Sequence, residues 1–434
     1  MRRFVLRIAE AGLVIAIWIA VLAFGGTSPA FFLPAQVIIL GLGVLLLSAS
    51  LRAPLSVGRF PVLVPLVLVA LVLLQIIPLP ARAGHTISIA QYQTVSQLLL
   101  LATYLTAFYV ALLVCEDRNA KRRLVYALIA LGAFEAFYGL VQYLTGWQHI
   151  FGYVKKYYLE DATGTYINRN HFAGLLEMAL PFTVALALDL AGKLRGDVQR
   201  SEAKARNLLI ASELFPLIFL SFLAVAIFIA LIFSRSRMGI ISAIASLIAI
   251  LALAGSTLPS KRIRIAAAVL FFVGIVGIVV WVGSDPVIGR FEVLGQEYSQ
   301  TGQNRIAIWR DTLKLIRQHP WLGTGLGTFS VAYTSVQTVF LNRLVDHAHC
   351  DYLEVVTELG LPGGFLVFAS FFWTLARAVR GYRKAENRFD AAVCLGCIGG
   401  ITAILVHSFA DFNLYIPANA LVFAVTLALA RTGK

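Results

Sequence analysis

Long apolar runs alternate with short polar segments along the whole chain. A helix crosses the hydrocarbon core of a bilayer with about 20 mostly apolar residues, and by this criterion the pattern predicts about twelve membrane-spanning helices. The expected fold is an all-α polytopic membrane protein, with a single transmembrane domain over residues 1–434. The spans are expected near residues 8–24, 31–50, 60–78, 96–114, 123–144, 171–191, 208–232, 238–257, 265–283, 359–376, 391–408 and 413–430.

The composition agrees with a bilayer as the solvent. Of the 434 residues, 59% are hydrophobic and 13% are charged, whereas about a quarter of the residues in a soluble domain are charged. The net charge of +14 could indicate nucleic-acid binding. However, the basic residues lie in short clusters between apolar runs and form no continuous stripe, so no nucleic-acid partner is expected.

The basic clusters also predict the topology. With both termini in the cytoplasm and alternating spans, about two thirds of the 36 lysines and arginines fall on the inner side, as the positive-inside rule requires. Residues 284–358 then form a long segment at the outer face. The first apolar run lacks a convincing small-residue cleavage site after it, so we expect a retained helix rather than a signal peptide.

The first group of outer-face arginines lies in the sequence Ser234-Arg235-Ser236-Arg237, between two spans. An arginine at the membrane edge usually has a partner or a function, and a guanidinium group matches the geometry of a phosphate. The alternative is that these side chains snorkel from a helix end to the interface. We favour a role in binding a phosphate-bearing ligand.

A second group, Arg305 and Arg310, lies on an expected amphipathic helix over residues 303–318. Its apolar positions are Ile306, Ile308, Trp309, Leu313 and Ile316. Arg305 and Arg310 are five residues apart, so they do not share one helix face. A solvated helix face is the alternative interpretation, and we prefer it for Lys314 and Arg317.

Two histidines follow in residues 346–354. His347 and His349 flank Ala348 beside several carboxylates, a pattern that can bind zinc. No further ligand spacing supports a metal, so neither a metal nor a cofactor is expected. A histidine that acts on a hydroxyl, as a base or as a hydrogen-bond partner, fits better. A structural histidine remains the alternative.

A polar group opens the span near 171–191. Asn168, Arg169, Asn170 and His171 precede its apolar run. Such side chains can simply cap a helix, or Arg169 can face an anion at the helix N-terminus.

Together these groups suit a reactive anionic lipid. Arginines would hold a diphosphate and neutralise the leaving group, while a histidine would take the proton of an attacking sugar hydroxyl. Two other classes of function stay open. A transporter or lipid flippase would use midspan charges such as Glu135 and Glu177, and a non-catalytic scaffold of an envelope polysaccharide complex would use none of this chemistry. Cys394 and Cys397 lie in an apolar run and indicate small membrane-helix residues rather than a redox site.

Four motifs carry a resemblance, in this order along the chain: GTYINRNHFAG at 164–174, SRS at 234–236, RIAIW at 305–309 leading to HPWLGTGLG at 319–327, and HAHCDYLE at 347–354 followed by ELGLPG at 358–363. In them the chain resembles the O-antigen ligase / O-antigen polymerase superfamily, bacterial membrane glycosyltransferases of the GT-C type. The resemblance covers about residues 165 to 365.

The resemblance implies a metal-independent transfer of a glycan from undecaprenyl diphosphate, at the periplasmic face of the bacterial inner membrane. The acceptor is lipid A-core in a ligase of lipopolysaccharide biosynthesis, which we favour, or another lipid-linked glycan in a polymerase of O-antigen or exopolysaccharide. Catalytic roles fall to His349, Arg235 and Arg305. The expected substrate-binding residues are Arg237, Arg310, His347, Arg169, Asn170 and His171.

The chain departs from the family at one position. The family usually has asparagine after the second histidine, and here the residue is Cys350. A weakly hydrogen-bonding thiol replaces an amide that both donates and accepts. This change bears on how the acceptor is positioned.

Overall fold

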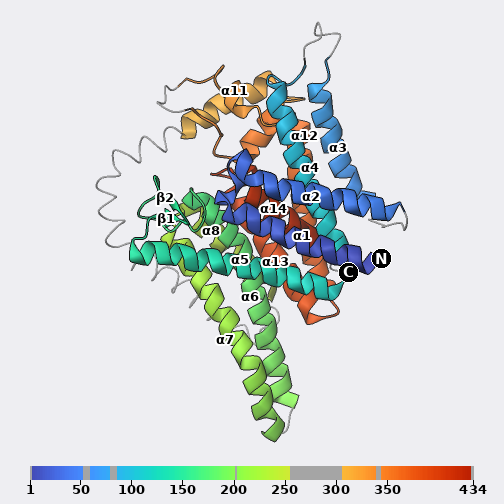
Figure 1. The fold of residues 1–434 in the computed structure, drawn as a ribbon, viewed down its shortest axis with the longest axis vertical. Helices are drawn as coiled ribbons and strands as arrows, with labels where there is room; N and C mark the ends of the chain where they lie inside the picture. Colours follow the sequence, from blue (N-terminus) through green and yellow to red (C-terminus); the bar gives the residue numbers. More distant parts are fainter. Residues whose placement is uncertain are drawn as a thin grey trace. The chain divides into compact units, whose positions relative to one another are not determined.

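The architecture was taken from a computed structural model, which describes residues 2–51, 59–78, 86–200, 203–254, 305–338 and 344–431 (Figure 1). These residues are helical apart from loops and one short antiparallel hairpin, in which His149 lies opposite Val154. The predicted all-α polytopic fold is confirmed for this part of the chain.

The helices follow one another as the apolar runs do. The elements are α1 (Arg2–Leu22), η1 (Phe24–Gly26), α2 (Pro29–Ser50), α3 (Arg59–Ile76), α4 (Gln91–Val114), α5 (Arg118–Thr145), β1 (His149–Ile150), β2 (Tyr153–Val154), α6 (Arg169–Arg200), α7 (Ala203–Phe233), α8 (Arg237–Ala254), α11 (Phe329–Tyr333), α12 (Asp351–Lys384), α13 (Arg388–His407), η4 (Asn413–Tyr415) and α14 (Pro417–Leu429). A further helix covers residues 305–318.

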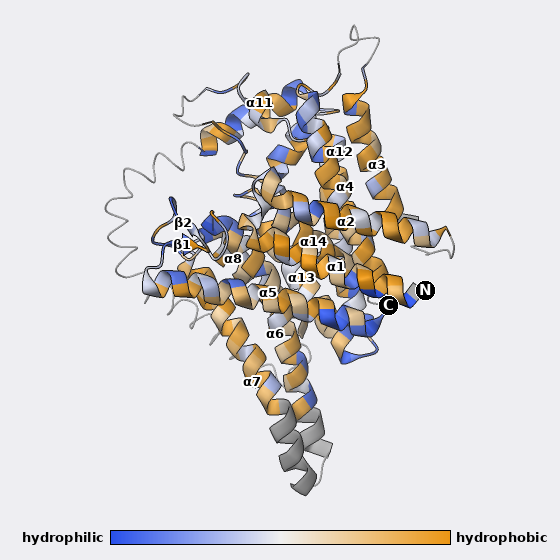
Figure 2. Cartoon of the chain, in the orientation of Figure 1, coloured by the Kyte–Doolittle hydropathy of each residue, from blue (hydrophilic) through white to orange (hydrophobic). Residues whose placement is uncertain are grey.

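Within the described ranges, 9 helices are long and apolar enough to cross a membrane. Two shorter apolar helices, Val62–Ile76 and Pro417–Leu429, coincide with two more predicted spans. Figure 2 shows how far apolar residues dominate these helices. The chain is therefore a multi-pass membrane protein. The predicted span 265–283 lies outside the described residues, so the count of twelve stays a prediction.

The chain divides into two compact units. Unit 1 comprises Met1–Val67, Leu98–Ile250 and Val367–Lys434, and unit 2 comprises Leu68–Gln97 and Leu251–Leu366. Each unit is described by itself below. Arg169, Asn170, His171, Arg235 and Arg237 belong to unit 1, whereas His347 and His349 belong to unit 2.

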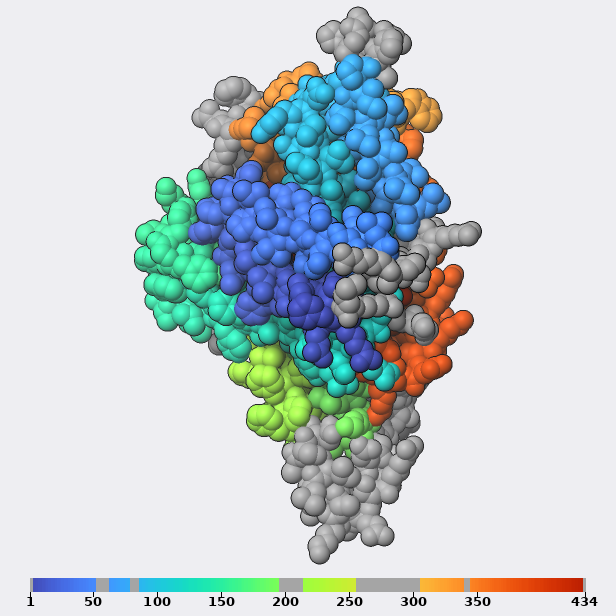
Figure 3. All heavy atoms as spheres, turned by 45° about the vertical axis from the view of Figure 1, so that its right-hand side comes forward, coloured from blue at the N-terminus to red at the C-terminus, as the bar shows by residue number. Residues whose placement is uncertain are grey.

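Small residues allow the helices of unit 1 to pack closely. A side chain at Gly396 of α13 would collide with Phe182 of α6, and one at Gly399 would collide with Pro181. Cys394 and Cys397 are buried free thiols on this helix, which fits the interpretation as packing residues. Elsewhere in unit 1, α1 and α2 lie side by side, as Figure 3 shows in dark blue.

Ion pairs join helix ends that the alternating topology predicts to be on the same side. Lys121 of α5 pairs with Asp390 of α13 at 2.9 Å, and Arg123 pairs with Glu10 of α1 at 2.5 Å. The side chain of Asp117 caps α5 by accepting from two backbone N–H groups. Relative to one another, the ends of these three helices in unit 1 lie as predicted.

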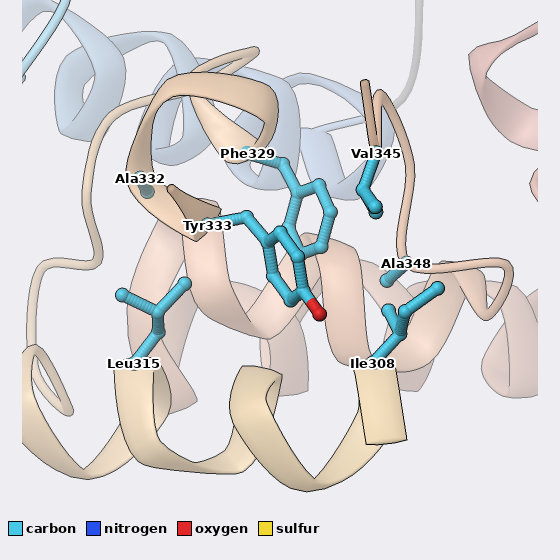
Figure 4. Close-up of a cluster of buried hydrophobic side chains, with 7 residues drawn as sticks. All are labelled: Ile308, Leu315, Phe329, Ala332, Tyr333, Val345 and Ala348. Carbon is cyan, nitrogen blue, oxygen red and sulfur yellow. The ribbon is translucent and has the colours of Figure 1, made fainter. Parts of the chain in front are cut away.

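The described part of unit 2 contains an apolar cluster of seven buried residues, shown in Figure 4. Ile308 and Leu315 of the helix over 305–318 face the stacked rings of Phe329 and Tyr333 of α11. The cluster is completed by Ala332, Val345 and Ala348. Val345 and Ala348 belong to the segment that carries the two histidines, so the packing of this cluster fixes where that segment lies.

The amphipathic helix was predicted correctly, but its inner face was not fully defined by its apolar positions. Ile306 and Leu313 are exposed, at 57% and 44%. Asp311 is buried instead and accepts hydrogen bonds from the backbone and side chain of Thr338. A partner for the Asp311 carboxylate lies 27 residues further along the chain, so the local hydrophobic pattern could not reveal which face is buried.

Two glycines bring the start of α12 against the loop that follows residue 318. Gly360 interrupts α12 with φ 72° and ψ 173°, a conformation that is almost restricted to glycine. A Cβ at Gly360 would collide with the backbone of Trp321, and one at Gly323 would collide with the backbone of Glu358.

We therefore expect Gly360→Ala to destabilise unit 2 by at least about 1–3 kcal/mol from the backbone conformation alone. The measurement is the thermal unfolding midpoint of the detergent-purified protein. Gly152→Ala is the matched control, because nothing lies within 4 Å of a Cβ built there. An unchanged midpoint for Gly360→Ala would contradict the prediction.

Candidate functional site

The Ser-Arg-Ser-Arg motif forms the turn between α7 and α8. Arg235 adopts a left-handed backbone with φ 54°, which is uncommon for a residue other than glycine. The hydroxyl of Ser236 accepts a hydrogen bond from the N–H of Gly239 at 3.2 Å and thereby caps α8. Arg237, the first residue of α8, is exposed.

A buried aspartate joins two of the predicted arginines. Asp161 pairs with Arg169 at 2.8 Å and lies 3.6 Å from the guanidinium of Arg235. Arg235 also pairs with the exposed Glu160 at 3.2 Å. The segment between α5 and α6, the start of α6 and the turn between α7 and α8 thus meet around one set of charges in unit 1. We call this set the arginine cluster (Lys155, Glu160, Asp161, Arg169 and Arg235).

Aromatic rings and a lysine complete the arginine cluster. Arg169 lies over Tyr158 and Arg235 over Tyr143, at 5.4 and 5.9 Å from the ring centroids. Lys155 donates to the backbone carbonyl of Asp161 at 3.0 Å. Burial lowers the pKa of Lys155 to about 8, although the charge of Asp161 acts in the other direction. The cluster holds more cationic than anionic groups, so it suits an anion.

The polar residues at the start of α6 have different roles. Asn168 caps the helix, because its side chain accepts from the N–H of Asn170 at 2.9 Å. Arg169 belongs to the arginine cluster. His171 is buried, and its ring meets Phe412 edge to face at 5.0 Å. Asn170 is half-buried.

In unit 2, Glu354 fixes the His-Ala-His segment from the first turns of α12. One carboxylate oxygen lies 2.6 Å from Nδ1 of His347, and the other accepts from the N–H of Ala348 at 2.7 Å. The indole N–H of Trp309 donates to the carbonyl of Ala348 at 3.0 Å. Arg305 precedes Trp309 by four residues, so both lie on the helix face that carries the histidine segment. Arg310 is exposed on another face.

His349 shares an unusual feature with Arg235. Its backbone is left-handed, with φ 51°. Such conformations cost of order 1–3 kcal/mol for a residue other than glycine and are enriched at functional sites. Arg235 and His349 were both predicted as catalytic from sequence.

The structure gives Cys350 a role in helix capping. Cys350 immediately precedes α12, and its carbonyl accepts from the N–H of Glu354 at 3.0 Å. Burial raises the pKa of the Cys350 thiol, although hydrogen bonds from the backbone N–H groups of Leu353 and Tyr352 act in the other direction. The thiol thus occupies the place of an N-cap side chain. Asparagine, the residue usual in the family, is a stronger N-cap.

We therefore expect Cys350→Asn to stabilise the protein, by about 0.5–1 kcal/mol, because an amide oxygen accepts from the backbone better than a thiol. The thermal unfolding midpoint of the purified protein would show the gain. Cys350→Ala, which leaves no cap, should lower the midpoint. Equal midpoints for the asparagine and alanine variants would count against a capping role.

The midspan carboxylates hold helices and loops of unit 1 together. Glu135 accepts from the backbone N–H and the hydroxyl of Thr165, at 2.8 and 2.7 Å. Glu177 of α6 lies 2.9 Å from Nδ1 of His407 of α13. In the described residues no group of three or more His, Cys, Asp or Glu side chains is arranged to hold a metal ion.

Sequence reasoning missed the three residues that organise these groups: Asp161, Glu354 and Trp309. Glu354 and Trp309 were part of the quoted motifs but received no role. Asp161 precedes the first motif by three residues. Its negative charge, close in sequence to Arg169, was the feature that could have indicated an ion pair. The structure brings Arg169 and Arg235 together in unit 1, and places Arg305, Arg310, His347 and His349 in unit 2.

Comparison with known proteins supports the resemblance. Residues 222–368 match the model of a family described as O-antigen ligase. This segment includes Arg235, Arg237, Arg305, Arg310, His347 and His349, while Arg169, Asn170 and His171 precede it. No curated protein matches the chain significantly. Members of the matched family are glycosyltransferase-like enzymes that act on lipid-linked glycans in a membrane. The domain at residues 222–368 therefore supports the assignment of this multi-pass membrane protein to the O-antigen ligase/polymerase superfamily.

Proposed function

We propose that the protein transfers a glycan from undecaprenyl diphosphate to an acceptor hydroxyl at the periplasmic face of the bacterial inner membrane, and that the acceptor is lipid A-core. One observation carries the proposal: the two left-handed residues Arg235 and His349 lie inside the segment that matches the O-antigen ligase family. Backbone strain at an arginine and a histidine is retained where the side chain has a task.

The reaction is an exchange of one glycosidic bond for another. The acceptor oxygen attacks the anomeric carbon of the first donor sugar, and a new carbon–oxygen bond forms there. The bond from that carbon to the diphosphate breaks, and undecaprenyl diphosphate leaves. The acceptor hydroxyl gives its proton to His349. Arg235 and Arg305 stabilise the negative charge that develops on the leaving diphosphate.

The remaining residues would bind and orient. Arg169 would add charge to the site of Arg235, because Asp161 holds the two together. Arg237 and Arg310 are exposed and would meet the donor or acceptor at the rim. Asn170 and His171 would line the start of α6. The charge that a metal ion would otherwise supply comes from the arginines, so the transfer should proceed in EDTA.

The test is reconstitution in liposomes. Purified protein is mixed with a glycan linked to undecaprenyl diphosphate and, in separate reactions, with lipid A-core or with a second lipid-linked glycan, always with EDTA. Product on lipid A-core is expected and would establish a ligase. Longer lipid-linked chains would instead establish a polymerase of the same superfamily. No product with either acceptor would overturn the proposal and favour a transporter or a scaffold.

A further inference from the structure

The segment before α12 carries two histidines, His347 and His349, and a buried carboxylate orients the first of them. His347 is held at Nδ1 by Glu354, at 2.6 Å, and its side chain is 24% exposed. The same carboxylate accepts from the N–H of Ala348. Glu354 is only 1% exposed, so these two contacts replace hydrogen bonds to water. The imidazole therefore lies against a buried carboxylate.

The position of Glu354 in the helix supports the charged form of its carboxylate. It is the fourth residue of α12, and the N-terminal turn of a helix stabilises negative charge. An asparagine or glutamine could not accept from both Ala348 and His347 without turning N–H groups toward one of these donors. A carboxylate is therefore the group that suits both contacts.

The carboxylates near His347 favour its cationic form. Burial lowers the pKa of His347, but the charge and hydrogen bond of Glu354, with further effects from the charges of Asp346 and Glu358, outweigh burial and raise it to about 9. A histidine that is already protonated at neutral pH cannot accept the proton of an acceptor hydroxyl. It can donate a strong hydrogen bond to a phosphate oxygen.

We propose that Glu354 is a positioning residue that holds His347 as a cationic hydrogen-bond donor to a phosphate oxygen of a substrate. The inference rests on the proposed function, and it gives the two histidines different roles. His349 takes the proton of the acceptor, and His347 binds an anion. The phosphate belongs either to the donor diphosphate or to lipid A-core, and the Michaelis constants for the two substrates distinguish these sources.

The first experiment measures the pairing without any transfer reaction. Exchange of the imidazole C2 hydrogen for deuterium, followed by mass spectrometry of the purified full chain between pH 5 and 10, reports the titration of each histidine. His347 should titrate near 9, and Glu354→Gln should return it toward the ordinary 6.5. His319 serves as the internal reference. Asp311→Asn, which alters another buried carboxylate of unit 2, should leave the His347 midpoint unchanged.

The same pairing predicts how stability depends on pH. The folded-state pKa of His347 is raised, so the pair contributes stability that is fully present below about 6.5 and is lost as pH rises through about 9. The thermal midpoint of wild type should fall over this window more than that of Glu354→Gln. If His347 titrates near 6.5 in wild type, or if Glu354→Gln leaves its midpoint in place, the inference is wrong.

The second experiment measures the role of His347 in glycan transfer. His347→Lys keeps a cation and should transfer at least about tenfold faster than the neutral His347→Gln. Glu354→Gln should move the alkaline limb of the pH–rate profile to lower pH and raise the Michaelis constant of the phosphate-bearing substrate. Equal losses in the two His347 variants with an unmoved profile would overturn the positioning role. Complete inactivity of wild type would overturn the proposed function instead, while the histidine titration would still decide the pairing.

Discussion

Replacing His349 by glycine is expected to lower the rate of glycan transfer by about 10²–10⁴-fold, the usual contribution of a general base, while the protein stays folded in the membrane. Glycine suits this position because the backbone has φ 51°, a region that glycine adopts without strain. The variant therefore removes the imidazole without a cost to the backbone. His349→Ala should lose as much activity, with some additional loss of stability.

Chemical rescue separates a base from a residue that only orients the acceptor. Added imidazole should restore part of the activity of His349→Gly, because a small base can enter the space of the missing side chain. His349→Asn keeps hydrogen-bonding capacity but cannot act as a base, so it should stay as inactive as the glycine variant. His319→Ala, at the end of the helix over 305–318, is the matched control. Normal transfer by His349→Gly would remove His349 from the chemistry.

The second large effect is expected at Arg235. Arg235→Ala should lower kcat/KM for the lipid-diphosphate donor by about 10²–10³-fold, as the loss of one charge-stabilising group typically does. Arg235→Lys should lie between wild type and alanine, because an ammonium keeps the charge and loses the planar fork that fits a phosphate. The measurement is donor-dependent transfer in liposomes, with inorganic pyrophosphate as a competing anion.

The partners of Arg235 supply the control. Glu160 is 70% exposed in its side chain and lies 3.2 Å from Arg235, so a bound diphosphate would have to displace it. Glu160→Gln should therefore lower the Michaelis constant of the donor by a few-fold, the scale expected for an exposed ion pair. Asp161 is buried against both Arg169 and Arg235, and Asp161→Asn should weaken donor binding by releasing the two guanidinium groups. Unchanged donor kinetics in Arg235→Ala would contradict the assignment.

The midspan carboxylates show the limits of residue type as a guide to function. Glu135 and Glu177 were singled out because a charge in a membrane helix usually has a function. In the structure, Glu135 binds the loop at Thr165 and Glu177 contacts His407 of α13. Both carboxylates have partners within unit 1, and these partners connect segments far apart in the sequence. The residue type indicated that each carboxylate needs a partner, but the sequence did not predict which residue that partner is.

The sequence alone predicted the long apolar helices that the described residues contain, because a window of about 20 apolar residues is a local property that needs no knowledge of the partner. It also predicted the amphipathic helix before Pro320 and the motifs at 234–236, 305–327 and 347–363, which lie within the segment that matches the O-antigen ligase family. The capping of α6 by Asn168, which the sequence allowed, involves a side chain within two residues of the backbone group that it binds.

Only the tertiary structure decided which charges act together. Asp161 binds Arg235 across 74 residues and two helices, and Trp309 reaches Ala348 across 39. Such contacts depend on how helices pack, which the spacing of residues along the chain does not encode. The left-handed backbone of Arg235 and His349 is likewise imposed by surrounding contacts, since an isolated arginine or histidine avoids it. Hydropathy therefore predicted the apolar helices, whereas packing within each unit specified the arrangement of the charged side chains.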